Sequence, residues 1–283
     1  MKIFDSFSEW FDGHQEMLDA LVFDIDGVLL LEKKPVAGSL ELLQKLRDHN
    51  IPFSLLTNDA CNSIEEKRAH LKEAGIEFAA EEIISAGHGL VELVQKRGLS
   101  DTLFFMMGTL GEPCYAQLAG LRITRDLKEL PDCVGVVVGE KRYDWQRTFN
   151  AVVNYFIHKS DALFIVPNPD EYFPVNSDRI ELASGATARF IQRVLQKCGV
   201  DIEPVYVGKP HSLIFEHCHA QFEAKLNRSL PRQRVAIIGD SLESDVLGGL
   251  NFGYRSALVL SGLTDTAMLK NSQVKPDLVF KRL

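Results

Sequence analysis

Two acidic residues end an apolar segment near the start of the chain. Residues 21–28 read LVFDIDGV, so that Asp24 and Asp26 follow three apolar side chains and precede Gly27. In a strand that continues through them, residues two apart point to the same side. Two carboxylates held that close favour a bound metal ion or a shared proton. The structural alternative is a polar strand end with an Asp-Gly turn, and this segment alone leaves both interpretations open.

Three further apolar segments end in polar residues of suitable chemistry. These residues are Thr57 with Asn58, Lys209, and Asp240 with Asp245. Carboxylate and carbonyl oxygens suit magnesium, which keeps several waters and a substrate phosphate oxygen. A lysine offers phosphate a point charge, and a threonine offers a hydroxyl donor. Singly, these signals are weak: a turn or helix cap is the favoured explanation for Thr57 and Asn58, a solvated loop side chain for Lys209, and an N-cap is plausible for Asp240. Their order at successive strand ends favours a phosphate site with a metal.

Strand and helix patterns alternate along the whole chain, which predicts a Rossmann-like parallel sheet flanked by helices. The outer segments contain predicted strands at 21–23, 53–56, 234–239 and 256–260, and predicted helices at 40–48, 63–73, 212–225 and 242–250. Ligands of open α/β sheets bind outside the carboxyl ends of the strands. The polar strand ends are therefore expected to converge at one edge.

A middle block has enough elements to fold around a second core. Its predicted strands are 102–107, 134–138 and 162–166, and its helix is 144–158. That helix has an amphipathic stripe, which we interpret as core; its members are Trp145, Phe149, Val152, Val153, Phe156 and Ile157. We therefore predict a catalytic core formed by residues 1–87 and 205–283, with an α/β domain, residues 88–204, inserted in it.

Composition excludes several classes of function. The net charge of −8 argues against a nucleic-acid surface, and no apolar run approaches the roughly 18 residues of a membrane span. The start of the chain lacks the basic and apolar regions of a signal peptide. Five scattered cysteines without a C-x-x-C pair predict neither disulfides nor a zinc site, and a metal site at His217, Cys218 and His219 is disfavoured. We expect a soluble cytoplasmic protein.

The ordered polar residues resemble the four motifs of the haloacid dehalogenase superfamily. The matching residues are Asp24-Ile-Asp26-Gly, Thr57-Asn58, Lys209, and Gly239-Asp240 with Asp245. Further short segments are similar to sequence motifs of the NagD-like phosphatases, namely Asn168-Pro-Asp170, Gly208-Lys-Pro210, Gly253 and Leu260-Ser-Gly262. The resemblance covers nearly the whole chain. The middle block lies between the second and third motifs, as does the large α/β cap domain of one subgroup.

The resemblance implies a role for each motif residue. Asp24 would be the nucleophile that forms an aspartyl-phosphate, and Asp26 would protonate the leaving oxygen and later activate water. The side chains of Asp24 and Asp240 and the carbonyl of Asp26 would hold magnesium, with Asp245 supporting the ion directly or through water. The transferring phosphoryl group would be bound by Thr57, the backbone near Asn58, and Lys209.

The sequence departs from the subgroup pattern at a few positions. Asp59 stands where a second asparagine commonly follows Thr-Asn, and a carboxylate facing phosphate would repel it. We favour a capping role toward the helix at Ser63 over a role in substrate choice. Ser244 replaces a common threonine and keeps the hydroxyl.

The sequence thus predicts a magnesium-dependent phosphatase acting on a small phosphorylated metabolite, either a sugar phosphate or a nucleoside monophosphate. A phosphomutase using the same intermediate is the near alternative. A non-catalytic phospho-aspartate binding module is the distant one, since it needs neither the insert nor the second acid. The cap would choose the substrate, with candidate residues at Lys141, Asn168, Asp170 and Glu181 that are each better explained as structural. Homo-oligomer formation is left open.

Overall fold

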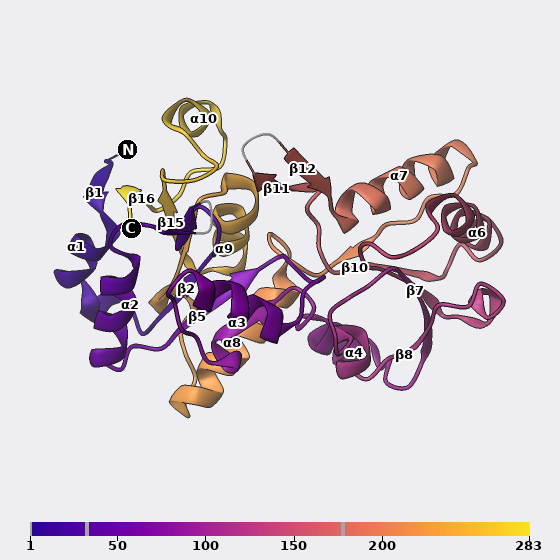
Figure 1. Ribbon diagram of the computed structural model, residues 1–283, viewed down its shortest axis with the longest axis horizontal. Helices are drawn as coiled ribbons and strands as arrows, with labels where there is room; N and C mark the ends of the chain where they lie inside the picture. Colours follow the sequence, from indigo (N-terminus) through magenta and orange to yellow (C-terminus); the bar gives the residue numbers. More distant parts are fainter. Residues whose placement is uncertain (1, 32–33, 177–178) are drawn as a thin grey trace. The chain divides into compact units, whose positions relative to one another are not determined.

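Two parallel sheets organise the chain in the computed structural model, which describes residues 2–31, 34–176 and 179–283 (Figure 1). One compact unit contains the residues up to Thr57, Ile64–Ile84 and Lys209–Leu283, and the other contains Asn58–Ser63 and Ser85–Gly208. The predicted fold class, a Rossmann-like core with an inserted α/β domain, is confirmed. The exact functional boundaries after residues 87 and 204 stay a prediction.

The seven-stranded sheet of the first unit carries the predicted strand ends at Asp24, Thr57 and Asp240, whereas the strand before Lys209 belongs to the other sheet. Its strands, in spatial order, are β1 (Phe4–Ser6), β16 (Leu278–Arg282), β15 (Arg255–Val259), β14 (Val235–Gly239), β2 (Ala20–Phe23), β5 (Phe53–Thr57) and β6 (Ile83–Ser85). The pairings from β1 through β5 are parallel. Every residue of β2, β5 and β14 is buried. Burial on both faces explains why these strands are continuously apolar in sequence.

Short and long helices accompany this sheet. They are α1 (Phe7–Asp12), α2 (Ser39–Asp48), α3 (Ile64–Glu73), α8 (Ser212–Leu226), α9 (Leu247–Phe252) and α10 (Thr266–Asn271), with 3-10 turns at Gln15–Met17, Ala80–Glu82 and Arg232–Arg234 and a small hairpin of β3 (Leu30–Leu31) and β4 (Lys34–Pro35). The helix predicted at 242–250 is corrected. A π-helical turn, Leu242–Val246, precedes α9. Such turns insert an extra residue per turn and recur at functional sites.

The two ends of the chain form one edge of the same sheet, which the sequence patterns did not predict. Strand β1 pairs in parallel with β16, with Phe4 opposite Phe280. The ring of Phe7 meets that of Phe280 edge-on at 5.3 Å, and the Ser6 hydroxyl donates to the carbonyl of Leu283 at 2.9 Å. Strand β1 has only three residues, so its alternation is too brief to detect from sequence.

The second unit has its own five-stranded parallel sheet. In spatial order its strands are β13 (Val205–Tyr206), β10 (Leu163–Val166), β9 (Gly135–Val138), β7 (Leu103–Met107) and β8 (Arg122–Thr124). The remaining elements are α4 (Leu90–Arg97), α5 (Tyr115–Leu118), a 3-10 turn (Leu130–Asp132), α6 (Trp145–His158), α7 (Ser184–Lys197), and a hairpin of β11 (Tyr172–Asn176) and β12 (Arg179–Leu182). The three strands predicted for this block are confirmed.

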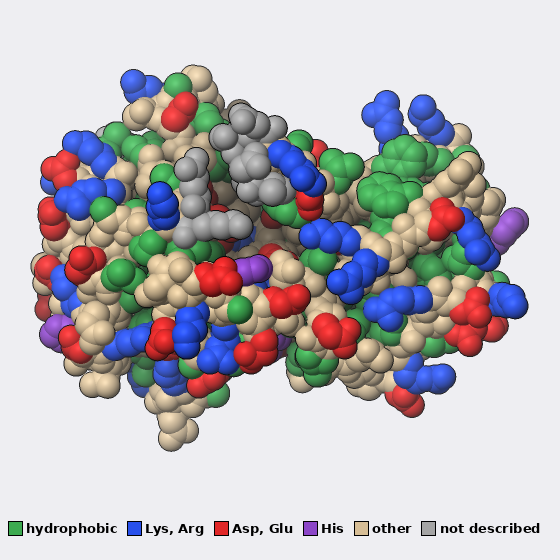
Figure 2. Space-filling model, in the orientation of Figure 1, with side chains coloured by type: hydrophobic (Ala, Val, Ile, Leu, Met, Phe, Trp, Pro, Cys, Tyr) green, Lys and Arg blue, Asp and Glu red, His purple; other side chains and the backbone are tan. Residues whose placement is uncertain are grey.

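The amphipathic stripe of α6 is core only in part. Val152 and Phe156 are fully buried, but Trp145 is 48% and Ile157 37% exposed, so the prediction is wrong for these two residues. Both lie in the end turns of the helix, where periodicity does not tell whether a neighbour covers the side chain. Trp145 stacks on Phe149 at 5.4 Å, and Figure 2 shows apolar side chains gathered on this face of the second unit, which also contains Phe190.

Two predictions about composition can be compared with the structure. All five cysteines are free thiols. The two histidines of the disfavoured metal site on α8 have different partners: the Nδ1 atom of His219 lies 3.2 Å from the Tyr254 hydroxyl, whereas His217 lies 3.0 Å from the Gln221 amide. No helix within the described ranges is long and apolar enough to cross a bilayer.

Candidate active site

Adjacent strands of the first unit bring Asp24 and Asp240 to the same edge of the sheet. Strands β2 and β14 are neighbours, with Phe23 opposite Ile238, and the backbone N–H of Asp24 donates to the Ile238 carbonyl at 2.9 Å. Each strand therefore delivers an acid at its carboxyl end. Together with Asp245, these residues place three carboxylate oxygens within 4.8 Å of one another. The structure therefore brings together three acids that the sequence motifs had singled out.

Lys209 is buried in the middle of this acidic cluster. Its side chain is 2% exposed, and its ammonium lies 2.7 Å from Asp24 Oδ1 and 2.7 Å from Asp245 Oδ1. Burial opposes the charged form, but the negative charges of Asp24 and Asp245 outweigh it, so the pKa of Lys209 is raised. The lysine is therefore a fixed cation that holds two acids in position.

Asp240 sits between two glycines that leave room for its carboxylate. A Cβ atom built on Gly27 or on Gly262 would lie 2.0 Å from Asp240 Oδ2. Gly27 also has a φ of +77°, which disfavours any other residue. The N–H of Leu263 donates to the same oxygen at 2.6 Å. The backbone around Gly262 thus fixes this acid, a contact that only the motif at residues 260–262 could have indicated.

Asp245 is held by partners on both of its oxygens. Its side chain is 1% exposed, and Oδ2 accepts a hydrogen bond from the Ser241 N–H at 3.2 Å. A Cβ atom on Gly239 would lie 2.2 Å from the Asp245 side chain, so a glycine is needed at the end of β14. The π-helical turn at Leu242–Val246 aims the carboxylate back at this strand end. These contacts fix the orientation that Asp245 offers to Lys209.

The acidic cluster carries more negative charge than Lys209 can offset. Burial and then the charges of Asp24 and Asp245 raise the pKa of Asp240 to about 8. Burial also raises the pKa of Asp245 to about 6, against the opposing effect of Lys209. An all-oxygen donor set with surplus negative charge fits a hard divalent cation such as magnesium.

Thr57 lies on the strand next to β2, at the same edge, whereas Asp26 stands apart from the clustered carboxylates. Thr57 ends β5, which pairs with β2 through Leu55 and Phe23, and it is 8% exposed. Asp26 is exposed and forms a backbone bridge with Leu30. Its side chain is not one of the three gathered carboxylates, which agrees with the separate task of a general acid. A carbonyl contact to metal from Asp26 stays a prediction.

Asn58 directs its side chain toward the second unit, to which it belongs. It is 6% exposed, and its amide Nδ2 donates to Asp170 Oδ1 at 3.0 Å. Phosphate binding by Asn58 would therefore use the backbone N–H, as the resemblance implies, and the side chain serves another purpose.

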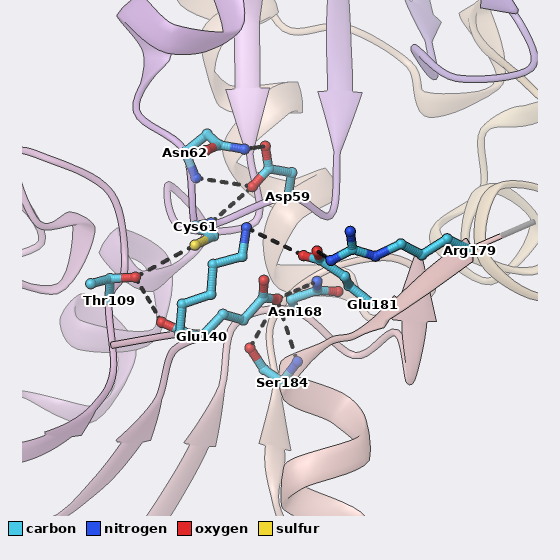
Figure 3. A network of polar contacts seen from close by, with 10 residues as sticks. Asp59, Cys61, Asn62, Thr109, Glu140, Asn168, Arg179, Glu181 and Ser184 are labelled. Atoms are coloured by element: carbon cyan, nitrogen blue, oxygen red, sulfur yellow. Dashed lines mark hydrogen bonds and ion pairs between the residues drawn. The ribbon is translucent and has the colours of Figure 1, made fainter. Parts of the chain in front are cut away.

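Asp59 closes the loop that follows. Its Oδ1 accepts hydrogen bonds from the N–H groups of Cys61 at 2.9 Å and Asn62 at 3.0 Å, and Oδ2 accepts from the Asn62 amide at 3.0 Å (Figure 3). The carboxylate thus makes local turn contacts, as the favoured interpretation expected. These N–H groups lie in the loop before α3 and not in its first turn, so the predicted helix cap is corrected to a loop cap.

The second unit contains a buried acid that the sequence analysis did not single out. Glu140 is 7% exposed and accepts hydrogen bonds from the Asn168 amide at 2.9 Å and from the Ser184 hydroxyl at 3.3 Å (Figure 3). Burial raises the pKa of Glu140. The signal was available, because Glu140 follows the apolar strand β9 as Asp24 follows β2. Glu181, by contrast, pairs with Arg179 at 2.7 Å and with Lys141 at 3.7 Å.

Two family models match the chain. A haloacid dehalogenase-like hydrolase model matches residues 21–122, which include Asp24 and Thr57. A HAD-hydrolase-like model matches residues 206–283, which include Lys209, Asp240 and Asp245. The chain is 27% identical to dihydroxyacetone phosphatase from Corynebacterium glutamicum over 253 residues, covering 89% of this chain and 85% of that protein.

Two further relatives extend the likeness over almost the whole chain. Ribonucleotide monophosphatase NagD from Escherichia coli is 27% identical over 266 residues, covering 92% of this chain and 94% of that protein. The crystal structure of a glycerol phosphate phosphatase from Mycobacterium tuberculosis in complex with magnesium superposes with a TM-score of 0.76 at 20% identity, covering 95% of this chain and 76% of that one. The chain therefore belongs to the haloacid dehalogenase-like hydrolases, as a phosphatase of the NagD-like subgroup with an inserted cap domain.

Proposed function

We propose that this phosphatase is magnesium-dependent and hydrolyses a small phosphomonoester, a sugar phosphate or a nucleoside monophosphate, through an aspartyl-phosphate on Asp24. The observation that carries the proposal is the position of the Asp24 carboxylate. It lies 2.7 Å from the buried ammonium of Lys209 and shares a cluster with Asp240 and Asp245. A carboxylate held beside a fixed cation is oriented, which a nucleophile at phosphorus requires.

In the first step, a carboxylate oxygen of Asp24 attacks the phosphorus atom and the bond from phosphorus to the substrate oxygen breaks. Asp26 gives its proton to that leaving oxygen. Asp26 is suited to this task because it lies two residues after the nucleophile and its side chain stays outside the acidic cluster. One such proton transfer contributes roughly 10² to 10⁴-fold to the rate.

In the second step, Asp26 takes a proton from a water molecule, whose oxygen attacks the phosphorus atom of the aspartyl-phosphate. The bond from phosphorus to Asp24 breaks and inorganic phosphate leaves. In both steps Thr57 donates its hydroxyl to a phosphoryl oxygen, and Lys209 offsets the charge on Asp24. Uncatalysed phosphomonoester hydrolysis is accelerated by enzymes up to about 10²¹-fold, so positioning and charge stabilisation must supply most of the effect.

The residues that would hold magnesium are Asp24 and Asp240 through their side chains and Asp26 through its carbonyl, with Asp245 in support. When bound, the ion neutralises charge on the phosphoryl oxygens and orients the group for in-line transfer. Burial, and then the charges of Asp24 and Asp245, raise the pKa of Asp240, and a cation at this site would offset both effects. The magnesium in the Mycobacterium tuberculosis relative agrees with it.

The proposed substrates follow from the relatives. One is a dihydroxyacetone phosphatase and another a ribonucleotide monophosphatase, so small phosphorylated metabolites with either a sugar or a nucleoside leaving group are the class to test. The acidic net charge of −8 also disfavours long polyanions as substrates.

The test is a screen of sugar phosphates and nucleoside monophosphates for release of inorganic phosphate, with magnesium present and no bisphosphate added. We expect net phosphate release from at least one member of this set. Return of the phosphoryl group to substrate, or a requirement for an activating bisphosphate, would identify a phosphomutase instead. Stable phosphorylation of Asp24 without turnover would identify a binding module.

A further inference from the structure

One loop of the second unit contacts both chain segments that lead into the phosphate-binding residues. The loop is residues 167–170. Its Asp170 accepts the hydrogen bond from the Asn58 amide at 3.0 Å, and the Pro167 carbonyl accepts one from the Gly208 N–H at 2.9 Å. Asn58 directly follows Thr57, and Gly208 directly precedes Lys209. The loop therefore contacts the chain neighbours of two residues, Thr57 and Lys209, that are proposed to bind the phosphoryl group.

Gly208 is packed so tightly that a side chain has no room. A Cβ atom at this position would lie 2.4 Å from Asn58 Oδ1, 2.8 Å from Pro169 Cδ and 3.0 Å from the Pro167 carbonyl oxygen. The side chain of Asn58 is thus enclosed between the loop and Gly208. Close packing of this kind transmits small displacements instead of absorbing them.

The loop is held from behind by the buried acid Glu140. Glu140 accepts a hydrogen bond from the Asn168 side-chain Nδ2 at 2.9 Å, and Oδ1 of the same side chain accepts one from the N–H of Asp170 at 3.0 Å. On the other side, the N–H of Gly185 at the start of α7 donates to the Asp170 carbonyl at 3.0 Å. Figure 3 shows the Glu140 carboxylate facing Asn168 and Ser184. Three hydrogen bonds in sequence therefore connect Glu140, through Asn168 and Asp170, to Asn58.

We propose that Asp170 is a positioning residue for the hydrolysis: by holding the Asn58 side chain, it fixes the backbone that presents Thr57 and the Asn58 N–H to the phosphoryl group, with Glu140 and Asn168 as its support. This inference rests on the proposed function and adds a residue to it. From the sequence alone, Asp170 is better explained as a structural residue. Its contact with a neighbour of Thr57 assigns it a part in the reaction.

The expected size of the effect follows from the interaction lost. Loss of a hydrogen bond to a charged group corresponds to roughly a tenfold change in an equilibrium constant. A displacement of about 1 Å in a positioning element can cost roughly 10²-fold in rate. We therefore expect Asp170→Ala to weaken binding of inorganic phosphate about tenfold and to lower kcat/KM at least about tenfold.

The matched control is the adjacent residue. Glu171 carries the same charge, is 57% exposed and pairs with Arg189 at 3.1 Å on the surface. Glu171→Ala removes one carboxylate from the same segment and should leave phosphate binding within about twofold of the unchanged protein. Asp170→Asn keeps an oxygen that can accept the Asn58 amide and should restore most of the loss. These comparisons separate positioning from a general change of charge or fold.

The experiment measures binding of inorganic phosphate by calorimetry with magnesium present, kcat and KM for p-nitrophenyl phosphate, and the magnesium concentration for half-maximal activity. The last should be unchanged in Asp170→Ala, because the acidic cluster lies in the first unit and Asp170 in the second. If Asp170 acts through Asn58, the double variant Asp170→Ala with Asn58→Ala should bind phosphate as weakly as either single variant.

Two results would overturn the inference. One is phosphate binding by Asp170→Ala equal to that of Glu171→Ala, and the other is losses that multiply in the double variant. Either could occur in an enzyme that hydrolyses phosphomonoesters, so the proposed function would survive. If the unchanged protein neither binds phosphate nor hydrolyses any phosphomonoester, the proposed function itself fails. Should Asp170→Ala be unstable, Gly208→Ala tests the same enclosure of Asn58 from the other side and should weaken phosphate binding as well.

Discussion

The close packing of the Asp240 carboxylate between Gly27 and Gly262 gives a quantitative prediction for Gly262→Ala. The added methyl carbon would lie 2.0 Å from Asp240 Oδ2, a distance that has to grow to at least 3.0 Å. Either the carboxylate or the loop at 260–263 must move by about 1 Å, and the hydrogen bond from the Leu263 N–H to the same oxygen leaves the carboxylate little freedom. A shift of that size at a metal and phosphate site can cost roughly 10²-fold in kcat/KM.

The assay measures phosphate release against magnesium concentration for the unchanged protein, Gly262→Ala and a control, Gly13→Ala. A Cβ atom at Gly13 meets only the Trp10 carbonyl at 3.8 Å, an ordinary contact. We expect Gly262→Ala to lose about 10²-fold in kcat/KM and to need more magnesium for half-maximal activity. Equal activity and equal magnesium dependence in Gly262→Ala and Gly13→Ala would refute the assignment of Asp240 to the metal.

Two other predictions concern the metal and the fold. Removal of divalent ions with EDTA should abolish phosphate release and added magnesium should restore it, whereas full activity in EDTA would contradict the ligand assignment. Asp19 bonds to Arg234 at 2.7 Å and Arg228 at 2.8 Å, and the hydrogen bond from Arg234, partly opposed by burial, lowers its pKa to about 2. Because the folded-state pKa lies below the unfolded value, this stabilisation is present above about pH 4 and lost toward pH 2. Urea unfolding should therefore find Asp19→Asn less stable than the unchanged protein by about 1–2 kcal/mol at pH 7, a value reduced because the arginines are half-exposed. The difference in stability should vanish near pH 2. A difference that stays constant with pH would contradict this assignment.

The sequence was sufficient to predict that Asp24, Asp240 and Lys209 lie close together, because each follows an apolar strand. Asp24, Thr57 and Asp240 end buried strands of one parallel sheet, and the parallel arrangement brings their side chains to one edge. Lys209 follows a two-residue strand of the other sheet, and its order in the chain identified it where strand length would not. Local pattern and chain order together therefore predict which side chains meet.

Contacts between loops were not predictable from the same patterns. Gly262 and the Leu263 N–H hold Asp240 by close approach of the backbone, which leaves no periodicity in the sequence. The bond between Asn58 and Asp170 joins residues 112 positions apart. Glu140 was overlooked although it follows a strand, because its partners Asn168 and Ser184 lie on other elements. Trp145 was assigned to the core because periodicity predicts a face, not what covers it.

The most direct test of the account is detection of phosphate on Asp24. The Asp26→Asn variant should lose the base that activates water, so the aspartyl-phosphate should accumulate when a substrate with a good leaving group, such as p-nitrophenyl phosphate, is added. Mass spectrometry of the quenched, digested protein should then find one phosphoryl group on the peptide that contains Asp24, and none after Asp24→Asn. Turnover that persists in Asp24→Asn, or a phosphoryl group on another residue, would contradict the central claim.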